Sequence, residues 1–275
     1  ELQAKWSDKL ANGFRYSVGV ALSDDKAKVV SYPSNPTNKI GDGVLYKGYT
    51  VGDIWGYVTG GILQEGDFDG VGANGKPLYH GPYFKGGQAY PGYIWYQDLD
   101  HDGVITTGLN TVDDPGDRKV IGNNAPRYRY NITANFQYKG FDLDLMFQGV
   151  GKRDYWLSST SSYWGNGAGS WEVYNNSWTP ERTDAKFPMY GSGTGSYPQT
   201  GYLLDASYIK LKQVILGYTF PRALINKIGL EKLRLNLAAY NLFTISDMPK
   251  YYDADYLSDA YPPKRTFSVG IQVGF

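Results

Sequence analysis

Apolar and polar residues alternate without interruption along the end of the chain, from Arg265 to Phe275. One face of this segment carries Phe267, Val269, Ile271, Val273 and Phe275, whereas the other carries only Thr, Ser, Gly and Gln. A period of two residues is typical of a strand with one apolar and one polar face. The segment ends on an aromatic residue, which favours the closing strand of a transmembrane β-barrel with Phe275 in its aromatic girdle.

A second alternating region, residues 130–148, predicts a tight hairpin. Residues 130–138 and 141–148 each place apolar side chains on one face, and Lys139-Gly140 forms the two-residue turn. The opposite face carries Asp142 and Asp144, which we expect to be wet lumen or plug contacts rather than catalytic acids. In a soluble protein the apolar face would be core, whereas in a barrel it would contact lipid.

Further strands are predicted at residues 14–22, 207–220 and 233–239. The apolar face changes within 207–220, which predicts a bulge near Gln213. Pro221 and Gly229 bracket a short helical turn. Gly-rich or aperiodic segments predict long loops at about residues 31–50, 64–92 and 150–205, with short strands or a bend at 51–63. About seven or eight strands with alternately short and long connections favour an all-β, antiparallel transmembrane barrel over a sandwich.

The amino-acid composition argues against several classes of function, namely nucleic-acid binding, thiolate metal binding and His-based catalysis. The 275 residues contain 27 basic and 27 acidic residues, no Cys and two His. We therefore expect no nucleic-acid partner, no thiolate metal site and no His-based catalysis, and we predict that the protein is not an enzyme. No apolar stretch approaches the roughly 18 residues of a spanning helix. The chain begins at Glu1 without a leader, which suggests a mature or partial chain.

Asp98, Asp100 and Asp102 alternate with other residues and precede Gly103, which is the spacing of the first half of a calcium loop. Leu109 stands where such a loop usually has its Glu, so another carboxylate would have to close the site. The predicted ligands are Asp98, Asp100, Asp102 and Asp117, with Asp113 or Asp114 as alternatives to Asp117. Without an ion the same residues would form an Asx-rich turn.

The chain is unusually rich in Tyr (26) and also contains 7 Trp. Several lie among Ser, Gly and Asn in the longest predicted loop. Their apolar rings with polar edges suit stacking on sugars, or equally interface anchoring and loop packing. The candidate substrate-binding residues are Tyr155, Trp156, Tyr163, Trp164 and Trp171.

Four stretches carry a resemblance to a known family. They are Ile54-Trp55-Gly56-Tyr57 with Gly61-Ile62; residues 95–105 (WYQDLDHDGVI) with 117–122 (DRKVIG); residues 207–221 (SYIKLKQVILGYTFP); and Asn241-Leu242-Phe243-Thr244 with Pro262, Arg265-Thr266-Phe267 and Phe275. In this order they resemble the C-terminal barrel of SusC/RagA-like TonB-dependent outer-membrane transporters. The resemblance spans most of residues 14–275.

The resemblance implies that residues 1–275 form the C-terminal strands of a 22-stranded barrel, with the plug, TonB box and N-terminal strands absent. It implies active import across the outer membrane of a Gram-negative bacterium, powered by TonB through the missing plug and assisted by a SusD-like surface lipoprotein. Family substrates are mainly oligosaccharides, and some members import peptides. The alternatives that the residues leave open are a soluble carbohydrate-binding β-sandwich and, less favoured, a glycosidase-type enzyme.

Overall fold

The computed structural model describes residues 1–41, 43–157, 171–250, 252–257 and 263–275. The chain divides into two compact units, which we treat separately. The sheet unit comprises Glu1–Asp25, Pro126–Arg153 and Asp205–Phe275. The loop unit comprises Lys26–Ala125 and Asp154–Leu204. The predicted loops 31–50 and 64–92, and most of 150–205, fall within the loop unit.

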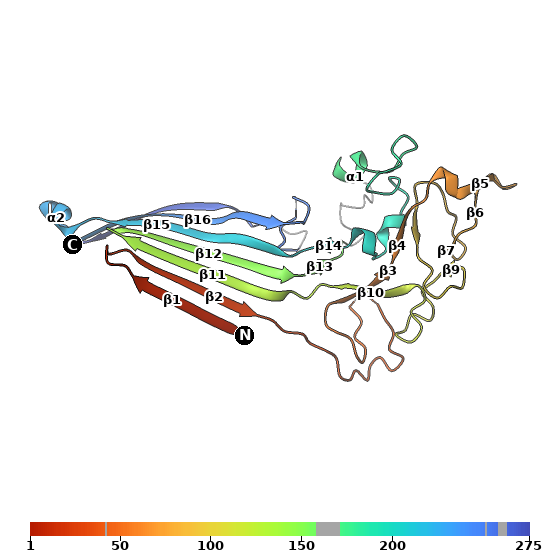
Figure 1. The fold of residues 1–275 in the computed structure, drawn as a ribbon, viewed down its shortest axis with the longest axis horizontal. Helices are drawn as coiled ribbons and strands as arrows, with labels where there is room; N and C mark the ends of the chain where they lie inside the picture. Colours follow the sequence, from red (N-terminus) through yellow and green to blue (C-terminus); the bar gives the residue numbers. More distant parts are fainter. Residues whose placement is uncertain (42, 158–170, 251, 258–262) are drawn as a thin grey trace. The chain divides into compact units, whose positions relative to one another are not determined.

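The sheet unit contains one antiparallel sheet of seven strands among its described residues, in the order β1-β2-β11-β12-β15-β16-β17 (Figure 1). The strands are β1 (Leu2–Lys9), β2 (Arg15–Ser23), β11 (Arg127–Tyr138), β12 (Phe141–Lys152), β15 (Tyr208–Thr219), β16 (Lys232–Ser246) and β17 (Thr266–Gly274). Six of them lie over the predicted strand segments. The seventh, β1, was not predicted, because its alternation is weakened by the small Ala4 and by the charged Asp8.

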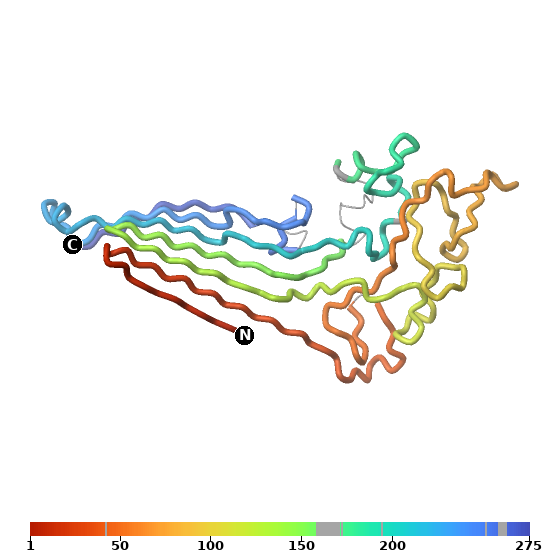
Figure 2. The backbone as a smooth tube through the Cα atoms, viewed as in Figure 1, coloured from red at the N-terminus to blue at the C-terminus, as the bar shows by residue number. Residues whose placement is uncertain are grey.

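Short turns join neighbouring strands at one end of the sheet (Figure 2). Lys139 and Gly140 both have positive φ angles, 46° and 88°, as a type I′ hairpin turn requires. The predicted helical turn is confirmed as α2 (Arg222–Ile225) followed by η4 (Asn226–Ile228), and Gly229 ends it in the left-handed conformation. The three connections at the opposite end are the long ones, so short and long connections alternate along the chain.

The predicted bulge lies one residue from its expected position. Strand β15 shifts register against β16 between Leu211 and Gln213. It also shifts against β12, where Met146 and Phe147 are its partners. Against β12, Lys212 is thus the extra residue of a β-bulge, which explains why the apolar residues of this strand change parity in the sequence. Against β16 the extra residue is on β16, where Asn241 and Leu242 stand opposite Lys212.

Register aligns the apolar side chains in rows across the sheet. One row runs through Tyr16, Phe136, Leu143, Leu216, Leu237 and Val269. On the last two strands the side chains of this face are open to the surroundings, with Val269 76% and Ile271 67% exposed. Ile132, Phe136, Leu143 and Leu145 are only partly buried. The face is therefore not the interior of a two-layer sandwich.

Aromatic residues gather where the strands meet the short turns. Phe14 contacts Tyr138 and Phe136 with ring centroids 6.2 Å apart in both pairs. Phe141 contacts Tyr218 at 4.4 Å, and Tyr218 contacts Phe220 at 4.9 Å. A band of aromatic rings at one end of an apolar face is the arrangement expected of an interface girdle.

The loop unit is built from short strands. They are β3 (Asp53–Tyr57), β4 (Thr59–Ile62), β5 (Phe68–Val71), β6 (Pro77–Tyr79), β7 (Tyr83–Phe84), β8 (Ile94–Tyr96), β9 (Val104–Ile105), β10 (Arg118–Asn123) and β13 (Asp154–Tyr155). Strand β14 (Leu204–Asp205) follows at its end, and the helical pieces are η1 (Glu65–Asp67), α1 (Trp171–Asn175), η2 (Thr194–Ser196) and η3 (Thr200–Tyr202). Over the described ranges, no helix has both the length and the apolar character needed to cross a membrane.

Aromatic rings form part of the core of the loop unit. The buried Tyr57 and Tyr96 contact each other and Phe84 with ring centroids 5.1–5.4 Å apart. The exposed Tyr197 contacts Tyr57 at 5.9 Å and Phe84 at 5.0 Å. The buried hydroxyl of Tyr96 accepts a hydrogen bond from Gln199 at 3.0 Å, and burial raises the Tyr96 pKa. Part of the unusual Tyr content is thus explained by packing rather than by binding.

The exposed apolar face predicts a difference between adjacent residues of β17. Val269→Arg would place a charge on that face, whereas Ser268→Arg would place it on the polar face. For the full-length polypeptide in lipid vesicles, we expect Val269→Arg to lower the free energy of unfolding by about 2–4 kcal/mol and Ser268→Arg to have a much smaller effect. Urea titration measures both, and equal losses would contradict the assignment of the two faces.

Candidate functional site

The polar face of the sheet carries Asp142 and Asp144, which the sequence predicts to contact water of the lumen or the plug and which have partners within the sheet. Asp142 forms an ion pair with Arg234 of β16, across the intervening strand β15. Gly217 lies between them on β15, and a Cβ there would overlap both charged groups. Asp144 accepts a hydrogen bond from Asn135 on β11. Both carboxylates therefore have partners, which supports a structural role over acid–base catalysis.

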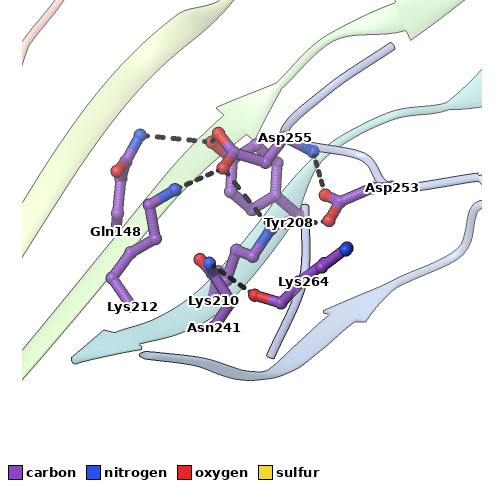
Figure 3. A network of polar contacts seen from close by, with 8 residues as sticks. All are labelled: Gln148, Tyr208, Lys210, Lys212, Asn241, Asp253, Asp255 and Lys264. Carbon is purple, nitrogen blue, oxygen red and sulfur yellow. Dashed lines mark hydrogen bonds and ion pairs between the residues drawn. The ribbon is translucent and has the colours of Figure 1, made fainter. Parts of the chain in front are cut away.

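A larger polar network lies near the long-loop end of the same face (Figure 3). Lys210 of β15 is 1% exposed, and its Nζ lies 2.6 Å from Asp253 Oδ2 and 3.5 Å from Asp255 Oδ2. Lys212, the bulge residue, places its Nζ 2.6 Å from Asp255. Since Lys210 and Lys212 are two residues apart on one strand, their side chains lie on the same face and both reach Asp255. Two cations and two anions thus balance in a partly buried site.

Tyr208 extends the network to β12. Its hydroxyl donates to Asp255 at 2.6 Å and accepts from Gln148 Nε2 at 3.4 Å. Burial opposes ionisation of Asp255, but hydrogen bonds from Lys212 and Tyr208 outweigh it and lower the Asp255 pKa. Asp255 therefore stays ionised at neutral pH.

The network attaches the β16–β17 connection to the wall of strands. Met248 and Ala254 in this connection are buried. Asn241 donates to the backbone carbonyl of Lys264 at 3.2 Å, and Ser246 Oγ donates to that of Ser207 at 2.9 Å. Sequence reasoning found these lysines only as part of a motif. The available signal was the spacing Tyr208-x-Lys210-x-Lys212 opposite a loop containing Asp253-x-Asp255.

In the loop unit, three of the predicted metal ligands come together. One carboxylate oxygen from each of Asp98, Asp100 and Asp117 lies within 4.8 Å of the others. Asp117 is fully buried and accepts backbone N–H bonds from Leu99 at 2.8 Å and Thr106 at 2.7 Å. Asp117, 15 residues beyond Asp102, thus closes the cluster rather than Asp113 or Asp114.

Asp102, the fourth predicted ligand, is not part of this cluster; it accepts from the backbone of Val104 at 2.8 Å. Asp98 accepts from the backbone of His101 at 2.7 Å and Gly103 at 2.8 Å. These are the bonds of the Asx-rich turn that the sequence offered as the alternative. Desolvation and the neighbouring carboxylates raise the Asp100 pKa, because the charged form of Asp100 loses solvation and is repelled by the other anions.

The candidate aromatic residues occupy different environments. Tyr155 and Trp156 are half-buried, whereas Trp171 of α1 is 77% exposed. Trp171 contacts the exposed Tyr174 edge-on at 5.9 Å. Tyr163 and Trp164 lie outside the described residues. Trp178 is buried, and its N–H donates to Gln64 at 2.9 Å, which shows that part of this aromatic-rich segment serves packing.

The chain is similar to known proteins in both sequence and fold. No family model matches the chain. TonB-dependent receptor P3 of Formosa agariphila is 28% identical over 289 residues, which cover 95% of this chain and 27% of the relative. TonB-dependent receptor SusC of Bacteroides thetaiotaomicron is 26% identical over 79% of this chain and 23% of SusC. The chain thus spans about a quarter of the length of these relatives.

Solved structures show the same fold. The RagAB peptide transporter matches 99% of this chain and 28% of its own, with a TM-score of 0.61 and 17% identity. The RagAB peptide importer in its closed-closed state gives a TM-score of 0.63 at 16% identity. The all-β, antiparallel barrel fold is confirmed by this similarity. The motifs, the sequence relatives and the fold agree, and they confirm that this chain resembles the C-terminal barrel part of SusC/RagA-like TonB-dependent outer-membrane transporters.

Proposed function

We propose that this chain forms part of the barrel wall of a TonB-dependent importer in the outer membrane of a Gram-negative bacterium. The observation that carries the proposal is the single sheet with an exposed apolar face and a charged polar face. In such a barrel the apolar face contacts lipid, and the polar face lines the space that holds the solute and the plug. The strand edges β1 and β17 each have one neighbour in the sheet, which leaves hydrogen-bonding groups for further barrel strands.

The similar proteins indicate which partners the barrel wall would work with. Their names identify TonB-dependent receptors, and RagAB is named a peptide importer. We infer that TonB acts through a plug located elsewhere in the full-length polypeptide, and that a SusD-like lipoprotein assists at the cell surface. The chain itself performs no bond chemistry in this scheme.

The proposed substrate is an oligosaccharide. The exposed rings of Trp171 and Tyr174 support this assignment, because aromatic faces stack on the apolar faces of sugars. A peptide substrate is the second candidate, favoured by the similarity to RagAB. An oligosaccharide would stack on the ring of Trp171, whereas binding of a peptide does not depend on this stacking.

We predict that Trp171→Ala weakens oligosaccharide binding by the full-length complex about fivefold or more, because one stacking surface is lost. Trp171→Phe is the matched control, since it retains a ring and should bind with intermediate affinity. Calorimetry with a mixed hydrolysate of starch, xylan and mannan, and separately with a casein digest, provides the measurement. Binding of the casein digest alone would identify a peptide importer instead.

We further propose that Asp98, Asp100 and Asp117 bind Ca²⁺ as a structural ion in the loop unit. Their convergence to within 4.8 Å supports the proposal, because hard cations prefer clustered carboxylate oxygens. Desolvation and the neighbouring carboxylates raise the Asp100 pKa, and an ion there would relieve the repulsion between the carboxylates. It would strengthen a loop whose turns already depend on Asp98 and Asp117.

The matched pair Asp100→Asn and Asp102→Asn tests this site. Asp100→Asn removes a ligand charge and should reduce calcium affinity about tenfold, whereas Asp102→Asn removes a carboxylate outside the cluster and should change it little. Calcium affinity should also decrease as the pH is lowered. The loss should begin at a higher pH than for an ordinary Asp site, because the pKa of Asp100 is raised and this carboxylate protonates first. Calorimetry with CaCl₂ measures both effects. Similar affinities for the two variants would refute the assignment.

A further inference from the structure

Beside the Lys210 network, the polar face of the sheet is hollowed. The lining of the hollow includes Ala21, Arg129, Asn131, Gln148 and Tyr208 of β2, β11, β12 and β15, and Asp255 of the β16–β17 connection. Arg153 and Glu1 also border it. Strand register places the five strand residues of the lining on the same face. Asp255 faces them from the connection, bonded to the hydroxyl of Tyr208 at 2.6 Å.

The row that crosses the hollow combines a small side chain with two amides. Asn131 is paired directly with Gln148 on one side and with Ala21 on the other. The methyl group of Ala21 leaves space above β2, and the amides of Asn131 and Gln148 are half-buried beside it. Each amide offers two donors and an acceptor, so together they can bind a ligand that both donates and accepts hydrogen bonds.

Asp255 supplies a carboxylate whose position is already determined. The Lys212 ammonium and the Tyr208 hydroxyl each hold it at 2.6 Å, from β15. A carboxylate has about four acceptor positions, so it can accept further bonds from a ligand. Because it is held before any ligand arrives, little ordering cost accompanies binding.

The cations at the hollow are engaged within the protein. Arg129 is paired with Asp25, and Lys210 and Lys212 are paired with Asp253 and Asp255. Arg153, which also lines the hollow, has an interaction of its own within the protein. Charges that are already engaged within the protein do not favour an ionic ligand. The available chemistry is instead two amides, a carboxylate and a tyrosine hydroxyl, which suits neighbouring hydroxyl groups.

We propose that this hollow is a wall subsite for a neutral, hydroxyl-rich unit, a sugar residue of the imported molecule. The inference rests on the proposed import function and deepens it. In this arrangement Asn131 and Gln148 bind the hydroxyl groups, Asp255 accepts from a neighbouring pair, and Lys210 and Lys212 are positioning residues that act through Asp255. The lysines thus connect the fold of the β16–β17 connection to the specificity of the barrel wall.

Two matched pairs of variants in the full-length complex test the subsite. Gln148→Ala removes an amide at the hollow, and Gln137→Ala removes one from the same face of the neighbouring strand at the short-turn end. Ala21→Trp fills the hollow, and Ser17→Trp adds the same bulk four residues along β2 on the same face. The probe is the mixed hydrolysate of starch, xylan and mannan, with retained sugars quantified by native mass spectrometry. The amount of folded barrel in the outer membrane is measured for every variant.

We expect Gln148→Ala to weaken retention about fivefold, the effect of one lost hydrogen bond, and Ala21→Trp to abolish it. The two control variants should retain sugars as the unsubstituted complex does. Normal retention by Gln148→Ala and Ala21→Trp would overturn the subsite while leaving the proposed function intact. If the unsubstituted complex retains no sugar, or only the casein digest, both the sugar subsite and the oligosaccharide proposal fail.

Discussion

The alternation of side chains across seven registered strands is the constraint on which the rest of this structure depends. In a strand, a slip of one residue exchanges the two faces, so the register also determines which side of the sheet is apolar. The hairpin turn at Lys139-Gly140 sets this register for β11 and β12, and the neighbouring strands continue it. As a result, a single sheet has one apolar and one polar face.

The bulge at Lys212 interrupts this alternation between β12 and β15. Lys210 and Lys212, which are two residues apart, lie on the same face, and both reach Asp255. Breaking one member of a buried charge pair leaves its partner uncompensated, which is costly. Since the lysines are on a strand and the carboxylates on a connection, this cost ties the connection to the wall. Two lysines of one strand thereby hold a segment that is distant in the sequence.

The loop unit obeys a different rule. Its strands are short, and aromatic rings such as those of Tyr57, Phe84 and Tyr96 form part of its described core. Large rings bury much area per residue, which compensates for the lack of long sheets in a segment rich in Gly. The Tyr content that suggests membrane interfaces or sugar binding therefore has three explanations in one chain. Packing accounts for Tyr96, the girdle for Tyr218, and the exposed surface for Tyr174.

The sequence by itself determined the long strands, the Lys139-Gly140 turn, the helical turn after Pro221 and the position of the bulge to within one residue. Each has a local signature, because side-chain alternation and turn chemistry involve residues close together in the chain. The motifs also indicated the family resemblance. Strand β1 escaped because its alternation is weak. In the loop unit, the sequence predicts short strands or a bend only at residues 51–63, where β3 and β4 lie, and the other strands escaped because runs of two to six residues show no clear period.

Only the tertiary structure decided which polar residues meet. Asp117 joins Asp98 and Asp100 while Asp102 turns to its own backbone, although all four are carboxylates at plausible spacing. Lys210 and Asp253 are 43 residues apart, and nothing local to either predicts the contact. Such pairings depend on strand order, register and the path of the connections together. A one-dimensional pattern records which face a residue occupies, but the partner across that face is set by the fold.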